Sequence, residues 1–208
     1  MTVPGVNVIV AATFLAAIGD IRRFADRRKL TAYLGLDPRV RQSGAGPATH
    51  GHISKQGSNS ARHALVEACW STVRQPGPMA AFYARVKAKR GHSIAIVASA
   101  RKLACLFWCL LTRGEDYAFA QPSLTAKKMR RLELAAGAPR RQGGRDVWST
   151  NKAMRHAERE LALQAQRAYE RTVKDWQQRG ASATPGRASN GSSKEQVARQ
   201  TPRPRSAL

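Results

Sequence analysis

The stretch IAIVASARKLACLFWCLL, residues 94–111, is the most apolar part of the chain and decides how the rest must fold. Its length would suit a membrane span, but Arg101 and Lys102 stand at its centre, where charges are costly in lipid. We therefore predict that it forms a buried helix of a protein core and that the chain has no membrane partner.

Helix signals lie on both sides of this stretch. Each expected helix ends at Gly or Pro, and two of them begin at residues that cap helices well. These helices run through Ile18 after a turn at Pro4 and Gly5, over about 26–34, from Ser58 or Asn59 to about 75, over about 79–90, and from a cap at Ser93 to about 113. Strand-like alternation is scarce, so the predicted fold is mainly α, with an extended loop or small hairpin between the second and third helices.

The composition changes after Tyr117 and suggests three regions. Residues 1–117 are expected to form a helical bundle with a helix-hairpin-helix-like start. Residues 118–178 read as a basic, charged helical extension that ends in a solvent-exposed helix. Residues 179–208 are rich in Gly, Ser, Pro and Arg, and we expect them to be a disordered tail.

The charge balance points to a polyanionic partner. Lys and Arg outnumber Asp and Glu by 36 to 13, which gives a formal net charge of +23. Nucleic acid is the partner that such a balance favours, because binding phosphates relieves the self-repulsion and releases counterions. A merely adhesive ribosomal or chromatin-like protein would share this partner class.

The loop over residues 39–57 carries a candidate nucleophile. Ser43 has Arg39 and Arg41 before it and Gly44 after it, so the backbone could approach a phosphate that the guanidinium groups stabilise. Lys55 and Arg62 could add to this cradle. From residue types alone, a solvated serine in a flexible loop is the more ordinary interpretation.

The turn that opens the first helix is a second candidate for phosphate binding. A tight turn at Gly5 followed by a helix start presents backbone N–H groups, and Asn7 stands where a helix-hairpin-helix motif usually has its second Gly. An ordinary capped core helix fits the same residues equally well.

The sequence predicts no metal site of its own. The cysteines at positions 69, 105 and 109 form no CxxC pair, and no two acidic residues stand together on one face of a core strand. We expect buried, reduced thiols and no cofactor held by this chain.

The order and spacing of several motifs resemble a known family. VPGVNVIVAATFLAAIGDIRRF, YLGLDPRVRQSG, GHISKQG and VASARKLACLFWCLLTRGEDY occur in the order found in the C-terminal transposase domain of the DEDD, bridge-RNA-guided insertion-sequence transposases of the IS110, IS116 and IS902 group. The resemblance covers about residues 2–117.

The resemblance implies a function for the loop. In this family a serine after the GL.P turn, here Ser43, attacks the scissile phosphate and holds a phosphoserine link during strand exchange. Four acidic residues of an N-terminal RuvC-like domain bind a divalent metal, so Mg²⁺ is expected only together with that domain. The implied partners are DNA, a guide (bridge) RNA and further copies of the chain, in the bacterial cytoplasm at the nucleoid.

Two interpretations remain open at this point. Because the chain begins at the helix-hairpin-helix-like turn, we expect the RuvC-like domain to be missing and the domain to be inactive alone. The chain would then be a transposase fragment whose ancestral role is serine-dependent DNA cleavage and rejoining. The alternative is a non-catalytic nucleic-acid-binding protein derived from such a transposase.

Overall fold

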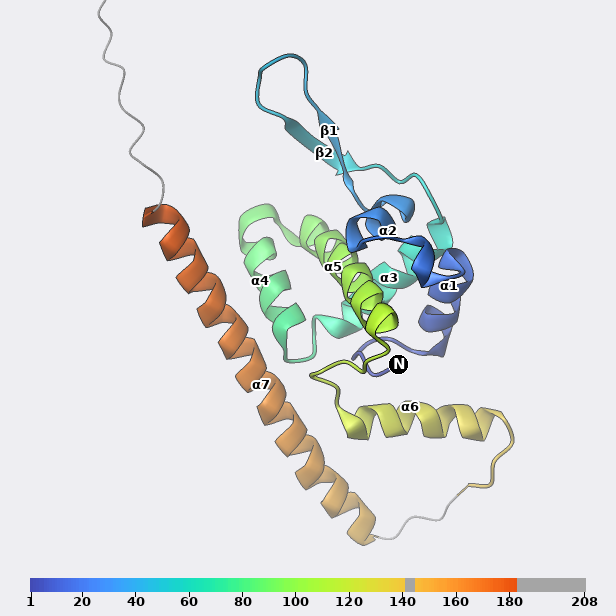
Figure 1. Cartoon of the computed structure of the whole chain (residues 1–208). Coiled ribbons are helices and arrows are strands. Elements are labelled where there is room, and N and C mark those ends of the chain that lie inside the picture. The colour runs from blue at the N-terminus through green and yellow to red at the C-terminus, as the bar shows by residue number, and fades with distance from the viewer. Residues whose placement is uncertain (141–144, 183–208) are drawn as a thin grey trace, which may run out of the picture. The chain divides into compact units, whose positions relative to one another are not determined.

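The apolar stretch forms the central helix of the fold, α5 (His92–Arg113). The computed structural model describes residues 1–140 and 145–182 (Figure 1). By length and composition α5 could cross a membrane. Its apolar face instead packs against α2 (Arg27–Tyr33), α3 (Asn59–Thr72) and α4 (Pro78–Arg90), which confirms the predicted buried helix. The residues that α5 buries are Ala95, Ile96, Ser99, Ala100, Leu103, Ala104 and Phe107.

Capping side chains fix where the first helices begin, and the cap predicted at Ser58 is confirmed. Asn7 Oδ1 accepts a hydrogen bond from the backbone N–H of Val10 at the start of α1 (Val8–Ile18). Asp26 caps α2 in the same way. The hydrogen bonds that its carboxylate accepts from backbone N–H groups, chiefly from that of Lys29, lower its pKa. Ser58 caps α3. A short 3₁₀ turn, η1 (Ile21–Arg23), joins α1 to α2.

One predicted cap is wrong. Gly91, with φ +81°, both ends α4 and begins α5, so Ser93 lies inside the first turn of α5. Gly91 alone joins the two helices, and its positive φ, which Gly adopts at little cost, reverses the direction of the chain there. No linker therefore remains in which Ser93 could act as a cap.

The core forms where α1, α3 and α5 meet. Phe14 of α1 and Phe107 of α5 pack edge to face, with ring centroids 4.9 Å apart. One face of α3 is buried along its length, through Ala61, Leu65, Cys69 and Thr72. Trp108 packs against this core and donates its indole N–H to the carbonyl of Phe24.

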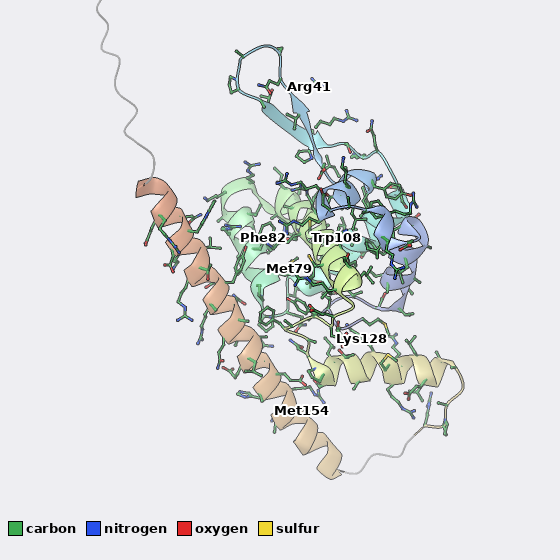
Figure 2. The ribbon with its side chains drawn as sticks, viewed as in Figure 1. Arg41, Met79, Phe82, Trp108, Lys128 and Met154 are labelled. Carbon is green, nitrogen blue, oxygen red and sulfur yellow. The ribbon has the colours of Figure 1, made fainter. Side chains whose placement is uncertain are left out.

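The helical extension follows the bundle. Lys128 of α6 (Pro122–Ala135) donates from Nζ to the carbonyls of Met1 and Val3, at 2.8 and 2.9 Å (Figure 2). Burial lowers the pKa of this amine. Gln166, in α7 (Arg145–Ser182), accepts a hydrogen bond from the backbone N–H of Gly77. These contacts belong to one compact unit, Met1–Val173, and the described residues from Lys174 onward belong to a second.

The predicted exposed helix is present, and it extends past the expected boundary at 178 to Ser182. Most of the predicted tail lies outside the described residues. The described part of the chain is mainly α, with a single two-stranded sheet, which confirms the predicted class.

Candidate nucleic-acid interface

The loop singled out by the sequence folds as a hairpin, which we call the serine arm (residues 38–53). Its strands are β1 (Pro38–Arg41) and β2 (Thr49–Ile53), paired antiparallel. Figure 1 shows the serine arm projecting from the helices. A register shift between the Pro38↔Ile53 and Arg41↔Thr49 pairs marks a bulge. Bulges increase the local twist and re-aim the strand end.

Ser43 lies in the connection between the two strands, close to the tip of the serine arm. Its side chain is exposed, and a Cβ built on the neighbouring Gly44 (φ +65°) would meet nothing within 4 Å. Arg39 and Arg41 are exposed and share one face of β1, because alternate residues of a strand point the same way. Arg39 Nη2, however, donates to the carbonyl of Ser54 at the base of the serine arm, at 3.2 Å, so of the two predicted arginines Arg41 is the one at the strand end that leads to Ser43. Figure 2 shows Arg41 on this projecting part of the chain.

Two glycines fix the base of the serine arm to the helices. Gly35, at the end of α2, has φ +69°, and a Cβ there would lie 2.3 Å from the carbonyl oxygen of Gln56. Gly57 has φ +123°, and a Cβ there would lie 2.0 Å from the carbonyl oxygen of Tyr33. Only glycine permits these two backbone segments to approach so closely.

A carboxylate just before β1 ties the base to α5. Asp37 Oδ1 accepts hydrogen bonds from Thr31 Oγ1 at 2.9 Å and from Arg101 Nε at 2.8 Å. The Asp37 carbonyl also accepts from the backbone N–H of Ser54, which closes the hairpin. Arg101, one of the two charges that interrupt the apolar stretch, is therefore an anchor of the serine arm.

Lys55 and Arg62 lie at the base of the serine arm, whereas Ser43 lies near its tip. About 10 Å separate the two ends of β1. Arg62 donates to the carbonyls of Leu34 and Gly57 and to Asn59 Oδ1, so its guanidinium holds local structure. Lys55 is exposed and has φ +57°, a left-handed conformation that is uncommon for a residue with a Cβ.

Gly5 and Asn7 both have structural roles at the start of α1. A Cβ on Gly5 would lie 2.5 Å from Thr72 Oγ1 and 2.6 Å from the carbonyl oxygen of Ala68. Thr72 donates to the carbonyl of Pro4. The turn is thus packed against α3, and Asn7 caps α1 as described above. Their contact with phosphate stays a prediction.

Metal ligands do not gather in the described residues: no group of three or more His, Cys, Asp or Glu side chains could hold an ion there. Cys69 is buried, and desolvation raises its pKa to about 12. Burial also raises the pKa of Cys105.

Sequence reasoning missed the long-range parts of this site. Nothing local indicated that Asp37 would bind Arg101, or that Gly35 and Gly57 would bring two backbones into contact. The glycines in GLDP (residues 35–38) and SKQG (residues 54–57) were the available signal, because a Gly that follows a helix or precedes a cap often allows a close approach.

Comparison with known proteins supports the family resemblance. Residues 1–84 match the family described as "Transposase IS116/IS110/IS902 family". The chain is 34% identical over 120 residues to the transposase for insertion sequence element IS1111A of Coxiella burnetii, an alignment that covers 56% of this chain and 33% of that protein. It is 31% identical over 121 residues to a probable family 20 transposase of Pseudomonas aeruginosa, covering 56% and 36%. A putative transposase of Sinorhizobium fredii is 43% identical over 72 residues, covering 35% and 18%.

The matched region contains α1, α2, the serine arm and α3, together with the beginning of α4. The chain spans about a third of the length of the first two relatives. The serine arm and α2, which contacts its base, thus lie within the matched region, whereas Arg101 of α5 lies outside it. Over residues 1–84 the chain is therefore similar to the IS116/IS110/IS902 transposase family.

Proposed function

We propose that this chain is the DNA-binding part of an insertion-sequence transposase, and that Ser43 is its nucleophile. One observation carries the proposal: the Ser43 hydroxyl is exposed near the tip of an arm whose base is fixed by Gly35, Gly57 and the Asp37–Arg101 ion pair. Because the base of the arm is fixed, the hydroxyl near its tip samples few positions. This lowers the entropic cost of placing the hydroxyl against a phosphate of the DNA backbone.

The proposed step is a transesterification at phosphorus. A bond forms between Ser43 Oγ and the phosphorus as one bond from phosphorus to a deoxyribose oxygen breaks. The serine proton passes through solvent to the released sugar hydroxyl, so the number of phosphodiester bonds is conserved and the reverse reaction can rejoin a strand. Arg41 stabilises the negative charge on the phosphoryl oxygens, and Arg39, whose guanidinium also donates to the Ser54 carbonyl, adds its positive charge from nearer the base.

Binding of the DNA backbone would extend beyond Ser43. Gly44 leaves room for a close approach, and Lys55 and the edge of the Arg62 guanidinium would contact phosphates nearer the helices. The backbone N–H groups at Gly5 and Asn7 would hold a further phosphate at the start of α1. A net charge of +23 gives each of these contacts a favourable long-range field.

The described residues do not fit the Mg²⁺ that this family implies. Asp37, the acidic residue at the base of the serine arm, is bound to Thr31 and Arg101. The proposal therefore assigns the metal to a separate RuvC-like domain, and no step above uses an ion held by this chain. DNA, a guide RNA and further copies of the chain are the proposed partners, in the cytoplasm at the nucleoid.

The test supplies a metal-binding RuvC-like domain of the family, Mg²⁺ and end-labelled DNA that carries an insertion-sequence end. The wild-type chain is expected to form a covalent protein–DNA adduct that survives denaturing electrophoresis, and Ser43→Ala is expected to form none. Ser60→Ala, which alters an exposed serine of α3, is the matched control and should form the adduct. An adduct that persists in Ser43→Ala overturns the assignment.

A non-catalytic nucleic-acid-binding protein is the second candidate, and the basic charge of the chain alone supports it. It predicts steeply salt-dependent DNA affinity with no adduct under any of these conditions.

A further inference from the structure

Three aromatic side chains gather on the surface where α3, α4 and α5 meet, in a region that the proposed cleavage does not use. We call Trp70, Tyr83 and His92 the aromatic cluster. The ring centroids of Trp70 and His92 lie 4.8 Å apart, and those of Tyr83 and His92 lie 5.8 Å apart at 87°. Each ring comes from a different helix, so the helical packing itself creates the cluster.

The aromatic cluster is ordered but open to solvent. A hydrogen bond joins the Tyr83 hydroxyl to His92 Nδ1, and Tyr83 packs against the core. Trp70 nevertheless keeps 36% of its surface exposed, and His92 is exposed. Large aromatic rings are usually covered when they serve only to pack a core, because they contribute most by burial. Because its neighbours already hold the Trp70 ring in place, a ligand that stacks on the ring costs little side-chain entropy.

Positive charge lies on the α4 side of the aromatic cluster. Lys87 Nζ lies 5.9 Å from the centroid of the Tyr83 ring, and the last turn of α4 adds Lys89 and Arg90, which are also exposed. The helix α4 contains no acidic residue. Exposed rings beside a row of cations match a flat, uncharged ring system attached to phosphates.

We propose that the aromatic cluster binds an unpaired nucleobase of single-stranded nucleic acid. The base stacks on Trp70, and the phosphates on either side of it contact Lys87 and the cations that follow it. Base-on-aromatic stacking is the usual way in which proteins hold unpaired strands, because every base has a flat face. The inference rests on the proposed function only in taking nucleic acid as the partner, and it is independent of Ser43.

The test measures the affinity of the full chain for labelled 12-nucleotide strands by fluorescence anisotropy, with no RuvC-like domain present. The probes are oligothymidine, oligouridine, an abasic strand of the same length, and a duplex. Trp70→Ala is expected to weaken binding of the base-containing single strands by about 5-fold to 100-fold. Its affinity for the abasic strand and for the duplex should stay within about twofold of wild type, because those probes offer phosphates without an accessible base face. A loss for oligouridine alone assigns RNA, a loss for oligothymidine alone assigns DNA, and a loss for both assigns recognition of the base without the sugar.

Trp176→Ala is the matched control, because Trp176 is 69% exposed on α7 and lies outside the aromatic cluster. It should bind every probe as the wild type does. Lys87→Ala should weaken binding of all four probes and reduce the salt slope by about 1. Unchanged single-strand affinity in a folded Trp70→Ala or Trp70→Leu protein overturns the proposal, and so does an equal loss for the abasic strand.

A second measurement uses the unaltered chain and holds even if both Trp70 variants unfold. A strand that carries 5-iodouracil is irradiated with the wild-type protein, and the crosslinked peptides are identified by mass spectrometry. Crosslinks at Trp70, Tyr83 or His92 support the site, and crosslinks confined to other peptides overturn it. Because neither assay involves cleavage, a failure to form the Ser43 adduct would leave their outcome unaffected.

Discussion

The contact between Gly57 and α2 gives the sharpest quantitative prediction. Replacing Gly57 with Ala places a methyl group 2.0 Å from the carbonyl oxygen of Tyr33, and 3.1 Å from the carbonyl carbon of the same residue. Both atoms belong to the backbone of the last turn of α2, so neither can move without breaking helix hydrogen bonds or shifting the serine arm. The change therefore tests whether the base of the serine arm is as tightly fixed as the structure shows.

Two terms set the size of the effect. Forcing an L-residue into a backbone with φ +123° costs about 1–2 kcal/mol. Overpacking against fixed backbone adds about 1–3 kcal/mol. The expected loss of unfolding free energy is therefore about 2–5 kcal/mol, a large part of the 5–15 kcal/mol that is typical of a folded domain.

Urea denaturation followed by circular dichroism measures this loss. With a slope of about 2 kcal/mol per molar, the midpoint should fall by about 1–2.5 M. Gly44→Ala is the control, because Gly44 also has positive φ but has open space around it, so it should cost only about 1 kcal/mol. If the two variants lose the same free energy within about 0.5 kcal/mol, the close approach at Gly57 does not contribute and the reasoning is refuted.

Three further predictions concern the charges and the buried thiol. Lys55→Gly replaces a lysine in the left-handed conformation, so thermal melting should show that the free energy of unfolding rises by up to about 1 kcal/mol. The same variant should bind duplex DNA more weakly in a titration, and unchanged DNA binding would contradict the proposed phosphate contact. A double-mutant cycle of Asp37→Asn and Arg101→Gln should give a coupling of about 0.5–1 kcal/mol, since the two side chains are 29% and 43% exposed, and no coupling would mean that the ion pair does not hold the base. Burial raises the pKa of Cys69 to about 12, so folding favours the protonated thiol: its stabilisation is complete below the unfolded pKa near 9 and is lost as the pH rises toward 12. Between pH 8 and pH 10 the wild type should lose about 1.5 kcal/mol more unfolding free energy than Cys69→Ala, and parallel pH curves would contradict this.

The local parts of the fold could be predicted from the sequence. The predicted cap at Ser58 is confirmed, because a short side chain that accepts from the backbone N–H three residues later is a local pattern. Asn7 and Asp26 cap their helices by the same local pattern, although the sequence interpretation placed Asn7 in a phosphate-binding turn. The buried face of α3 follows from helical periodicity in the same way. The cap expected at Ser93 was wrong because Gly91 ends one helix and starts the next, an economy that residue preferences do not reveal.

The parts that sequence reasoning missed depend on distance in space. Asp37 and Arg101 meet only because α2 and α5 pack together, and Trp70 reaches His92 only because α3 and α5 do. Patterns with a period of two or of 3.6 residues carry no information about such pairs. The exposure of Ser43 was expected from its glycine-rich surroundings, whereas the fixed base beneath it was not.

The central helix has a consequence for how the two proposed surfaces could cooperate. His92 belongs to the aromatic cluster and Arg101 anchors the serine arm, and both lie on α5. Helix geometry separates them by about 14 Å along the axis and about half a turn around it. Because one helix holds the two proposed binding surfaces at a constant spacing, a strand that binds one surface has a raised effective concentration at the other. The two weak interactions together therefore give avidity.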